Sequence, residues 1–376
     1  MSPETVPQIP NYSGVAEVCT EVYSSGRCVK SRPRQCLCRE KTRFPQSVKD
    51  VRPIPGADSI EAIGVLGWQC VAKKGEFHPG DPCVYFEIDS LLPEQPRYEF
   101  LRQSSFKPDL GRFRLRTVRF RGQLSQGLAL PVGLFPEVAG LPIGADLTAV
   151  LGVEQYEPPI PTFIAGDTRT FRWSIPKTDE IRVQMDDEHF FLAKLTSKPY
   201  FISLKLDGTS CTFIIDAKDG EFHACGRNYS YKQTPEHAFW KVADRYQIKA
   251  GLEAIGGAIA LQGEIVGPGI QCNKLGLQEV DFYVFTVVNT TTGRRLPLDD
   301  ALSVAATIGV PFVPVLERGD SFSYSLADLL EKAKGRYRDH FSGAKEAQER
   351  EGIVVRSLCG SISFKAINND FLLAEQ

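Results

Sequence analysis

The feature that most constrains this chain is an apolar run that ends in a lysine, FISLKLDG at residues 201–208. Side chains alternate between the two faces of a strand, so Lys205 and Asp207 point from one face towards whatever lies beside it. Gly208 then favours a turn. Taken alone, this pattern fits a solvated strand end as well as it fits a reactive site. The segments that follow in the sequence separate the two interpretations.

Further charged segments follow in a fixed order. They are CGRN at 225–228, LQGEIVGPGIQCNK at 261–274, DFYVF at 281–285, EGIVVR at 351–356 and SFKAIN at 363–368. Together with 201–208, they resemble the ordered motifs of the covalent nucleotidyltransferase superfamily of DNA ligases, RNA ligases and mRNA capping enzymes. Within it, the chain is most similar to ATP-dependent RNA ligases of the Deinococcus and Naegleria type, which carry an N-terminal OB domain. The resemblance covers roughly residues 46–373.

The resemblance implies an α+β protein, with an N-terminal OB-like β-barrel followed by a nucleotidyltransferase (ligase adenylation) domain of antiparallel sheets with flanking helices. Short strand-like runs at 64–72, 74–81 and 83–89, separated by glycine and proline, favour a small barrel. A proline-rich stretch favours a linker. The predicted parts are a poorly ordered extension (1–45), an OB-like nucleic-acid-binding domain (46–155), a linker (156–179) and the nucleotidyltransferase domain (180–376).

Composition excludes several classes of protein. No apolar run approaches the length that spans a bilayer, and the N-terminus lacks the layout of a signal peptide, so we expect a cytoplasmic protein with no membrane contact. The ten cysteines are scattered, which favours free thiols over a disulfide framework. The net charge of −2 means that any nucleic-acid surface must be a local basic patch. A monomer is the default expectation.

One strand-like segment, RFRLRTVRFR at 112–121, predicts such a patch. Its arginines are Arg112, Arg114, Arg116, Arg119 and Arg121. Because side chains alternate along a strand, the first three arginines lie on one face and the apolar residues between them lie on the other. The last two arginines fall on the opposite face, unless a β-bulge brings them to the same face as the first three. We predict contact with nucleic-acid phosphates, which arginine binds in a bidentate manner, over a merely solvated face. A second basic cluster at 27–39 fits either a nucleic-acid contact or a solvated tail.

Lys205 is the predicted catalytic residue. An amine that attacks a phosphate must lose its proton, which burial or nearby cations favour. The resemblance makes Lys205 the acceptor of AMP from ATP. Phosphoryl transfer also needs a divalent cation, and hard cations bind carboxylate and water oxygens. Asp207, Glu264 and Glu351 are therefore the predicted ligands for Mg²⁺ or Mn²⁺, although each also fits an ordinary strand-edge charge.

The resemblance assigns further residues to nucleotide binding. The full predicted set is Asp207, Gly208, Arg227, Glu264, Phe285, Glu351 and Lys365. Phe285 would stack on adenine, and Phe282 is the alternative. Either residue also fits an ordinary aromatic side chain of the protein core. Gly208 and Gly352 would allow close backbone approach. Gln271, Asn273 and Lys274 are assigned to the nucleic-acid or nucleotide surface.

The chain departs from the family pattern at three positions. Ser363 stands where many relatives have the first lysine of Lys-x-Lys, so either Lys365 suffices or another basic residue substitutes. Thr286 replaces an acid or amide that often follows the stacking aromatic. Leu204, with Ser203 before it, replaces an acidic residue that often reads the adenine amino group. The preference for ATP is thus an inference from the resemblance.

These observations predict an ATP-dependent RNA ligase. AMP would pass from Lys205 to a 5′-phosphate, and a 3′-hydroxyl would then seal a nick in duplex nucleic acid, with RNA on the 3′-hydroxyl side. A capping enzyme is disfavoured, since the eleven residues after Lys365 leave no room for a C-terminal OB module. The alternative from another class is a non-catalytic nucleic-acid-binding protein derived from a ligase.

Overall fold

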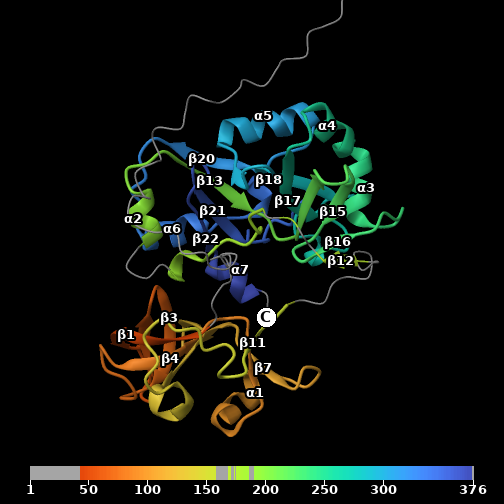
Figure 1. Ribbon diagram of the computed structural model, residues 1–376. Helices are drawn as coiled ribbons and strands as arrows, with labels where there is room; N and C mark the ends of the chain where they lie inside the picture. The colour runs from red at the N-terminus through yellow and green to blue at the C-terminus, as the bar shows by residue number, and fades with distance from the viewer. Residues whose placement is uncertain (1–42, 158–167, 171–172, 174, 186–189, 375–376) are drawn as a thin grey trace, which may run out of the picture. The chain divides into compact units, whose positions relative to one another are not determined.

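The computed structural model describes residues 43–157, 168–170, 173, 175–185 and 190–374 (Figure 1). Most of the predicted N-terminal extension, including its basic cluster, lies outside the described residues. Among those that are described, no helix combines the length and the apolar character needed to cross a membrane. The cysteines of this part of the chain, six in number, are all free thiols, as predicted.

Antiparallel strands dominate the first part of the chain. The larger sheet has the order β10-β4-β1-β2-β3, and the smaller has the order β11-β5-β7-β6. Their bounds are β1 Arg43–Pro53, β2 Ile60–Val65, β3 Trp68–Lys73, β4 Pro82–Phe86, β5 Ser90–Pro93, β6 Phe106–Lys107, β7 Arg112–Arg114, β10 Leu128–Pro131 and β11 Glu154–Gln155. The strands β8 (Thr117–Phe120) and β9 (Gln123–Gln126) form a separate hairpin. Short helical segments follow at η1 Pro96–Leu101, α1 Arg102–Ser105, η2 Val132–Leu134 and η3 Pro136–Val138.

Large aromatic residues fill the core of this barrel. One cluster is built around Trp68 and Tyr85, and the other around Phe86, Tyr98 and Phe135. Neighbouring side chains along a strand point to opposite faces, so Tyr85 packs in the first cluster and Phe86 in the second. The barrel predicted from short strands is therefore present, with its apolar residues inside.

Two predictions about individual strands were wrong. The run 64–72, predicted as one strand, is the hairpin β2–β3, and it reverses at Leu66, whose φ is 55°. The arginine segment does not form one bulged strand either. After Arg114 the chain leaves the smaller sheet and enters the β8–β9 hairpin, so the change in parity marks a change of sheet. Hydrophobic alternation alone could not reveal this, because it continues through buried Thr117.

The second part of the chain consists of two antiparallel sheets. The seven-stranded sheet has the order β12-β16-β15-β14-β17-β18-β19, and the four-stranded sheet has the order β20-β13-β21-β22. The strand bounds are β12 Thr168–Thr170, β13 Tyr200–Lys205, β14 Thr209–Ile215, β15 Phe222–Cys225, β16 Tyr229–Tyr231, β17 Ile259–Val266, β18 Asp281–Asn289, β19 Arg294–Arg295, β20 Val315–Gly319, β21 Gly352–Ser357 and β22 Ser363–Ile367.

Helices cover one face of the seven-stranded sheet. In Figure 1, α3 (Ala238–Arg245), α4 (Ile248–Ala254) and α5 (Leu298–Ile308) lie along β15, β17 and β18. Phe213, Phe239 and Phe282 are buried between these layers. The other face of the sheet meets the four-stranded sheet, through a cluster that includes Leu204 and Val266. The functional residues lie on this second face.

The remaining helices are short: η4 Val183–Met185, α2 Phe190–Leu195, η6 Gln271–Asn273, α6 Leu326–Ala333, η7 Tyr337–Asp339 and α7 Asn369–Ala374. The spacing of Ser325 and Asp328 in the sequence is that of a capping box, which predicts a helix from Ser325 onward. The structure confirms this helix as α6, and the two residues form the capping box. The predicted linker 156–179 contains β12, which pairs with β16 as the edge strand of the seven-stranded sheet.

Candidate active site

Lys205 and Glu351 form an ion pair at the end of two paired strands. Lys205 is the last residue of β13, and it lies opposite Gly352, the first residue of β21. Glu351 precedes Gly352, so strand pairing alone brings the two side chains together. Lys205 Nζ lies 2.7 Å from Glu351 Oε2, and both side chains are largely buried. This contact joins two motifs that are far apart in the sequence.

Three carboxylates determine the protonation of Lys205. Burial by itself would lower the pKa of this amine, but Glu351, Glu264 and Asp207 outweigh burial and raise it. For Glu264 on β17, burial is the main cause that raises the pKa, to about 8, and Glu351 and Asp207 add to it. Lys205 and Arg227 oppose this shift without cancelling it. Burial is thus the main reason that Glu264 favours its protonated form.

The carboxylates surround Lys205 without converging on one point. Among the described residues, Asp216, Asp219 and His223 lie close enough together to share one metal ion directly, whereas Asp207, Glu264 and Glu351 do not. A cation among Asp207, Glu264 and Glu351 would accordingly reach some of them through water. This is how hydrated Mg²⁺ is commonly held.

Lys274 pairs with Asp207, and a strained loop holds it there. Lys274 Nζ lies 2.6 Å from Asp207 Oδ2. Just before it, Gln271, Cys272 and Asn273 all have positive φ, at 42°, 58° and 48°. Such conformations cost energy for residues with a β-carbon and cluster at functional sites. Asn273 uses its side chain within the loop, donating to the carbonyl of Leu277 and accepting from its N–H group.

Tyr337, which the sequence interpretation missed, ties three site residues together. Its hydroxyl accepts hydrogen bonds from the N–H groups of Asp207 (2.9 Å) and Glu351 (3.3 Å). It donates to the carbonyl oxygen of Lys205 at 3.1 Å. Tyr337 is fully buried, and burial raises the pKa of its phenol well above the usual value. It lies outside every recognised motif, so only the fold reveals its position.

The two predicted glycines are required by close backbone approach. A β-carbon at Gly208 would lie 2.3 Å from the carbonyl oxygen of Ile265, and one at Gly352 would lie 2.2 Å from that of Ala366. Neither position can accept a larger residue without movement of the backbone. Gly208 lets the start of β14 approach β17, and Gly352 lets the start of β21 approach β22.

The two candidate stacking aromatics point in opposite directions. Phe282 is fully buried in the core under the helices, and its ring packs edge-to-face on Phe213. Phe285 is only partly buried and lies on the opposite face, next to the cluster that contains Leu204. Phe282 is therefore a core residue. Phe285 is the aromatic that faces the sheet carrying Lys205.

A buried ion pair lies beside Phe285, at the position where the chain departs from the family pattern. Arg356 donates to Ser363 Oγ at 2.9 Å, to the carbonyl of Phe285, and to Glu180 Oε1 at 2.8 Å. Arg295 approaches the same Glu180 oxygen at 3.3 Å. Burial alone would raise the pKa of Glu180, but the two arginines outweigh it and keep the pKa below the usual value. Ser363 thus meets a cation, although its own side chain carries none.

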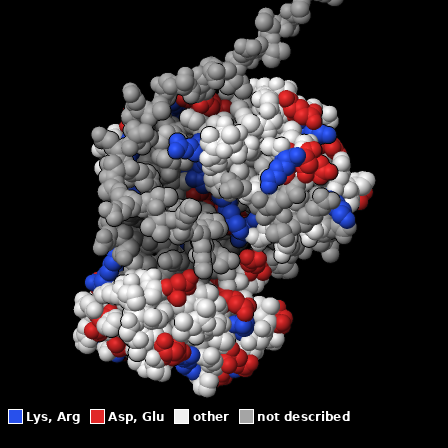
Figure 2. Space-filling model, viewed as in Figure 1, with Lys and Arg blue, Asp and Glu red and all other residues white. Residues whose placement is uncertain are grey.

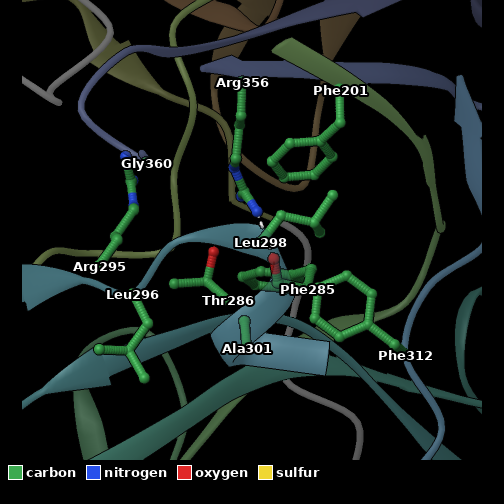
Figure 3. A pocket seen from close by; sticks show the side chains of 10 residues that line it. All are labelled: Phe201, Phe285, Thr286, Arg295, Leu296, Leu298, Ala301, Phe312, Arg356 and Gly360. Carbon is green, nitrogen blue, oxygen red and sulfur yellow. Dashed lines mark hydrogen bonds between the residues drawn. The ribbon is translucent and has the colours of Figure 1, made fainter. Parts of the chain in front are cut away.

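The space next to Arg356 is too small for a nucleotide. Figure 3 shows Arg356 between Phe201 and Phe285, at a cavity of about 10 Å³. A volume of this size holds about one water molecule. Arg356 on β21 donates to the carbonyl of Phe285 on β18, so this cluster connects the two sheets.

The segment that contains Glu180 was predicted as the end of a linker and the start of a domain, yet it lies along the site. Thr178 Oγ1 and Ser210 Oγ are 2.6 Å apart, and Arg227 binds Asp179. The N–H group of Lys365 donates to the carbonyl of Ile181 at 2.8 Å. The dense polar sequence KTDEIR at 177–182 was the available signal, and the nearby prolines obscured it.

The predicted arginine patch of the barrel is largely neutralised within the protein. Arg112 pairs with Glu154 at 2.6 Å, and Arg114 pairs with Asp89 at 2.8 Å. In Figure 2, acidic side chains predominate on the visible face of the barrel domain, whereas basic side chains form a broken line across the ligase-like domain. Arg121 is exposed, at the tip of the β8–β9 hairpin.

The fold and the site together define a class of protein. A small barrel precedes two antiparallel sheets, and between these sheets a strand-terminal lysine is surrounded by carboxylates. This is the architecture of a covalent nucleotidyltransferase.

Comparisons with known proteins identify the family. An OB-fold domain profile matches residues 45–132, and an RNA ligase profile matches residues 198–367. The chain is 36% identical to a solved apo variant of Naegleria gruberi RNA ligase, with a TM-score of 0.81, over 88% of this chain and 97% of that one. It is 37% identical to that enzyme with PPi, with a TM-score of 0.81, over 88% and 98%. The chain therefore belongs to the RNA ligase family.

The predicted family and architecture are thus confirmed, including the N-terminal OB fold. A further structure of Naegleria gruberi RNA ligase, with AMP and Mn, is 36% identical, with a TM-score of 0.81 over 88% of this chain and 98% of that one. No curated protein matches the chain in sequence.

Proposed function

We propose that this protein is an ATP-dependent RNA ligase that works through a lysyl-AMP intermediate. Lys205 Nζ attacks the α-phosphorus of ATP and pyrophosphate leaves. The 5′-phosphate of a nick then attacks the same phosphorus and releases the lysine. Finally, a 3′-hydroxyl attacks the activated 5′-phosphate, so that the strand is sealed and AMP leaves. The observation that carries the proposal is the position of Lys205, at a strand end among Glu351, Glu264 and Asp207.

In the absence of substrate, Lys205 is protonated, because the neighbouring carboxylates raise its pKa. An amine with a raised pKa cannot attack, so the proton must be lost once substrate is bound. Glu351 is the nearest acceptor, at 2.7 Å. Arg227 and Lys365 are the cations predicted to bind the nucleotide, and their charges would stabilise phosphate oxygens. Phe285 would stack on the base.

The site has the chemistry to hold Mg²⁺ or Mn²⁺. Asp207, Glu264 and Glu351 all act on the pKa of Lys205, and they supply oxygen donors of the kind that these ions prefer. When bound, such an ion neutralises charge on the phosphate oxygens. Solved structures of Naegleria gruberi RNA ligase contain ATP or AMP together with Mn.

Variants of the Naegleria gruberi enzyme support the same residues. Two of its solved variants replace a lysine and an aspartate two positions apart, as Lys205 and Asp207 are. Two others replace a glutamate and a lysine fourteen positions apart, as Glu351 and Lys365 are. These spacings match the predicted order of the site residues.

The proposed substrate is nicked duplex nucleic acid with RNA at the 3′-hydroxyl. We also propose that the OB domain ends at residue 155, that the nucleotidyltransferase domain begins at residue 180, and that the protein is a monomer. A cytoplasmic location is proposed as well, and the free cysteines agree with this location.

Intact mass tests the covalent step. After incubation with ATP and Mn²⁺, the wild-type protein should gain one AMP, Lys205→Ala should gain none, and the exposed-lysine control Lys198→Ala should behave as wild type. Nicks with RNA or DNA at the 3′-hydroxyl then test the substrate, and only the RNA nick should be sealed efficiently. An unmodified wild-type protein would favour the non-catalytic binding protein instead, and equal sealing of both nicks would refute the RNA requirement.

A further inference from the structure

The tip of the β8–β9 hairpin has an unusual sequence for its conformation. Arg121 and Gly122 connect the strands with φ values of 47° and 84°. Positive φ at both loop positions is typical of a type I′ turn, which favours Asn-Gly, Asp-Gly or Gly-Gly. An arginine at the first position is conformationally unfavourable. Such a choice, made against the local preference, points to a requirement for the side chain itself.

An exposed aromatic side chain stands next to this arginine. Phe120 closes the hairpin opposite Gln123, and 46% of its surface is exposed. Arg119 donates to the carbonyl of Gly122 at 3.3 Å and approaches Asp370 at 3.4 Å, so it braces the turn. Within the described part of the chain, Arg121 has no ion pair or hydrogen bond through its guanidinium. The tip therefore presents an uncovered ring beside an available cation.

Phe100, in the same domain, provides a contrast. It is 60% exposed, but the arginines close to it in sequence are already neutralised. Arg97 pairs with Glu137, and Arg102 pairs with Glu94 and Glu99. An exposed ring without an available cation is an ordinary surface feature. The combination at the hairpin tip is different because ring and cation together match a nucleotide.

We propose that Phe120 stacks on an unpaired base of the nucleic-acid substrate while Arg121 contacts a neighbouring phosphate. Every base has an aromatic face, so stacking suits an enzyme that must accept many sequences. Bases within an intact duplex have both faces covered, which makes a base at a strand break the accessible one. The inference rests on the proposed function, since it assumes that the substrate is a broken polynucleotide strand.

Binding to two probes tests the proposal, measured by anisotropy without ATP. Both probes are nicked duplexes with RNA at the 3′-hydroxyl, and they differ in whether a 2-aminopurine nucleotide at the nick is unpaired or paired. Phe120→Ala should weaken binding to the unpaired probe roughly 5- to 150-fold, the range expected for one stacked base. It should also remove the quenching of 2-aminopurine fluorescence. Binding to the paired probe should change little.

Two further variants serve as controls. Phe120→Trp should restore both affinity and quenching, because tryptophan also stacks on bases. Phe100→Ala should leave both unchanged. The proposal is overturned if Phe120→Ala matches Phe100→Ala, if both probes weaken equally, or if the variant loses self-association instead of nucleic-acid binding.

The mass measurement separates this inference from the proposed function. Phe120→Ala should still gain AMP from ATP, because the hairpin carries none of the proposed adenylylation residues. If the wild-type protein gains no AMP, the proposed function fails, yet the quenching experiment still reports whether Phe120 stacks on a base.

Discussion

Arg112 and Arg114 in the OB domain each meet one carboxylate, whereas Lys205 in the ligase domain is influenced by three. The Arg112–Glu154 pair is exposed at Glu154 and behaves as a separate contact of small energy, whereas Asp89 is partly buried and meets Arg182 as well as Arg114. The charges around Lys205 are partly buried and unequal in number, so each protonation state depends on the others. The difference shows that the number of charged residues in a segment does not predict whether the segment is a functional site. Burial and local balance decide whether an ion pair supports the structure or prepares a reaction.

Four predictions test this contrast through the free energy of unfolding. The largest effect is expected at the most deeply buried pair. Arg356→Ala leaves Glu180 charged and without its main partner, which should destabilise the protein by about 3–5 kcal/mol. Urea unfolding measures this loss. The triple variant Glu180→Gln/Arg295→Met/Arg356→Met removes all three charges of this cluster and should recover much of the stability. If it is as unstable as the single variant, the loss comes from packing and the charge argument is wrong.

Glu264→Gln should stabilise the protein in the absence of ATP and metal. A carboxyl group whose folded pKa is raised to about 8 keeps its proton in the folded state while the unfolded chain has lost it. Wild-type stability must therefore fall as pH rises from about 4.5 to about 8. A glutamine at position 264 does not ionise, so the variant does not lose this stability. The gain in its free energy of unfolding over the wild type should be small at pH 5 and reach roughly 2–4 kcal/mol at pH 9.

Urea unfolding at the two pH values checks this prediction, with Glu346→Gln as the exposed control. The same substitution should reduce AMP transfer. A stability advantage that is independent of pH would show that Glu264 is already ionised at neutral pH, so that burial raises its pKa less than inferred.

Tyr337→Phe removes one hydroxyl that binds three backbone groups of the site, those of Lys205, Asp207 and Glu351. The N–H groups of Asp207 and Glu351 lose their acceptor, which should cost about 1–3 kcal/mol. The rate of lysine adenylylation should fall as well, because Lys205 and Glu351 lose a shared anchor. Single-turnover mass measurements follow the rate, and Tyr229→Phe, whose side chain is exposed, is the matched control. A normal rate at reduced stability would limit Tyr337 to a purely structural role.

The smallest effects are expected in the arginine segment at 112–121. Arg112→Ala should cost no more than about 1 kcal/mol of stability, because its pair with Glu154 is solvent-exposed. It should leave the salt dependence of nucleic-acid binding unchanged. Arg121→Ala should lower the slope of that dependence by about one. Equal slopes for the two variants would mean that the internal pairs open on binding, and the contrast between the two regions would then disappear.

The order of the motifs in the sequence was enough to predict the family, and with it the α+β architecture and the OB fold. The spacing of Ser325 and Asp328 predicted the helix that begins after Ser325. These features depend on local patterns, since a capping box and an apolar run are both made by neighbouring residues. The likeness of 201–208 to a family motif also singled out Lys205. That it lies beside Glu351 follows from the pairing of β13 with β21, which local sequence does not specify.

Only the tertiary structure decided which charged residues already have partners. Glu180 and Arg356 are 176 positions apart, and no local pattern connects them. Tyr337 carries no motif, and its role depends on three backbone groups that only the folded chain brings within reach. The arginine strand looked like a single basic surface until its pairs with Asp89 and Glu154 were visible. Sequence determines which groups are present and their local geometry, whereas long-range packing determines which of them neutralise one another.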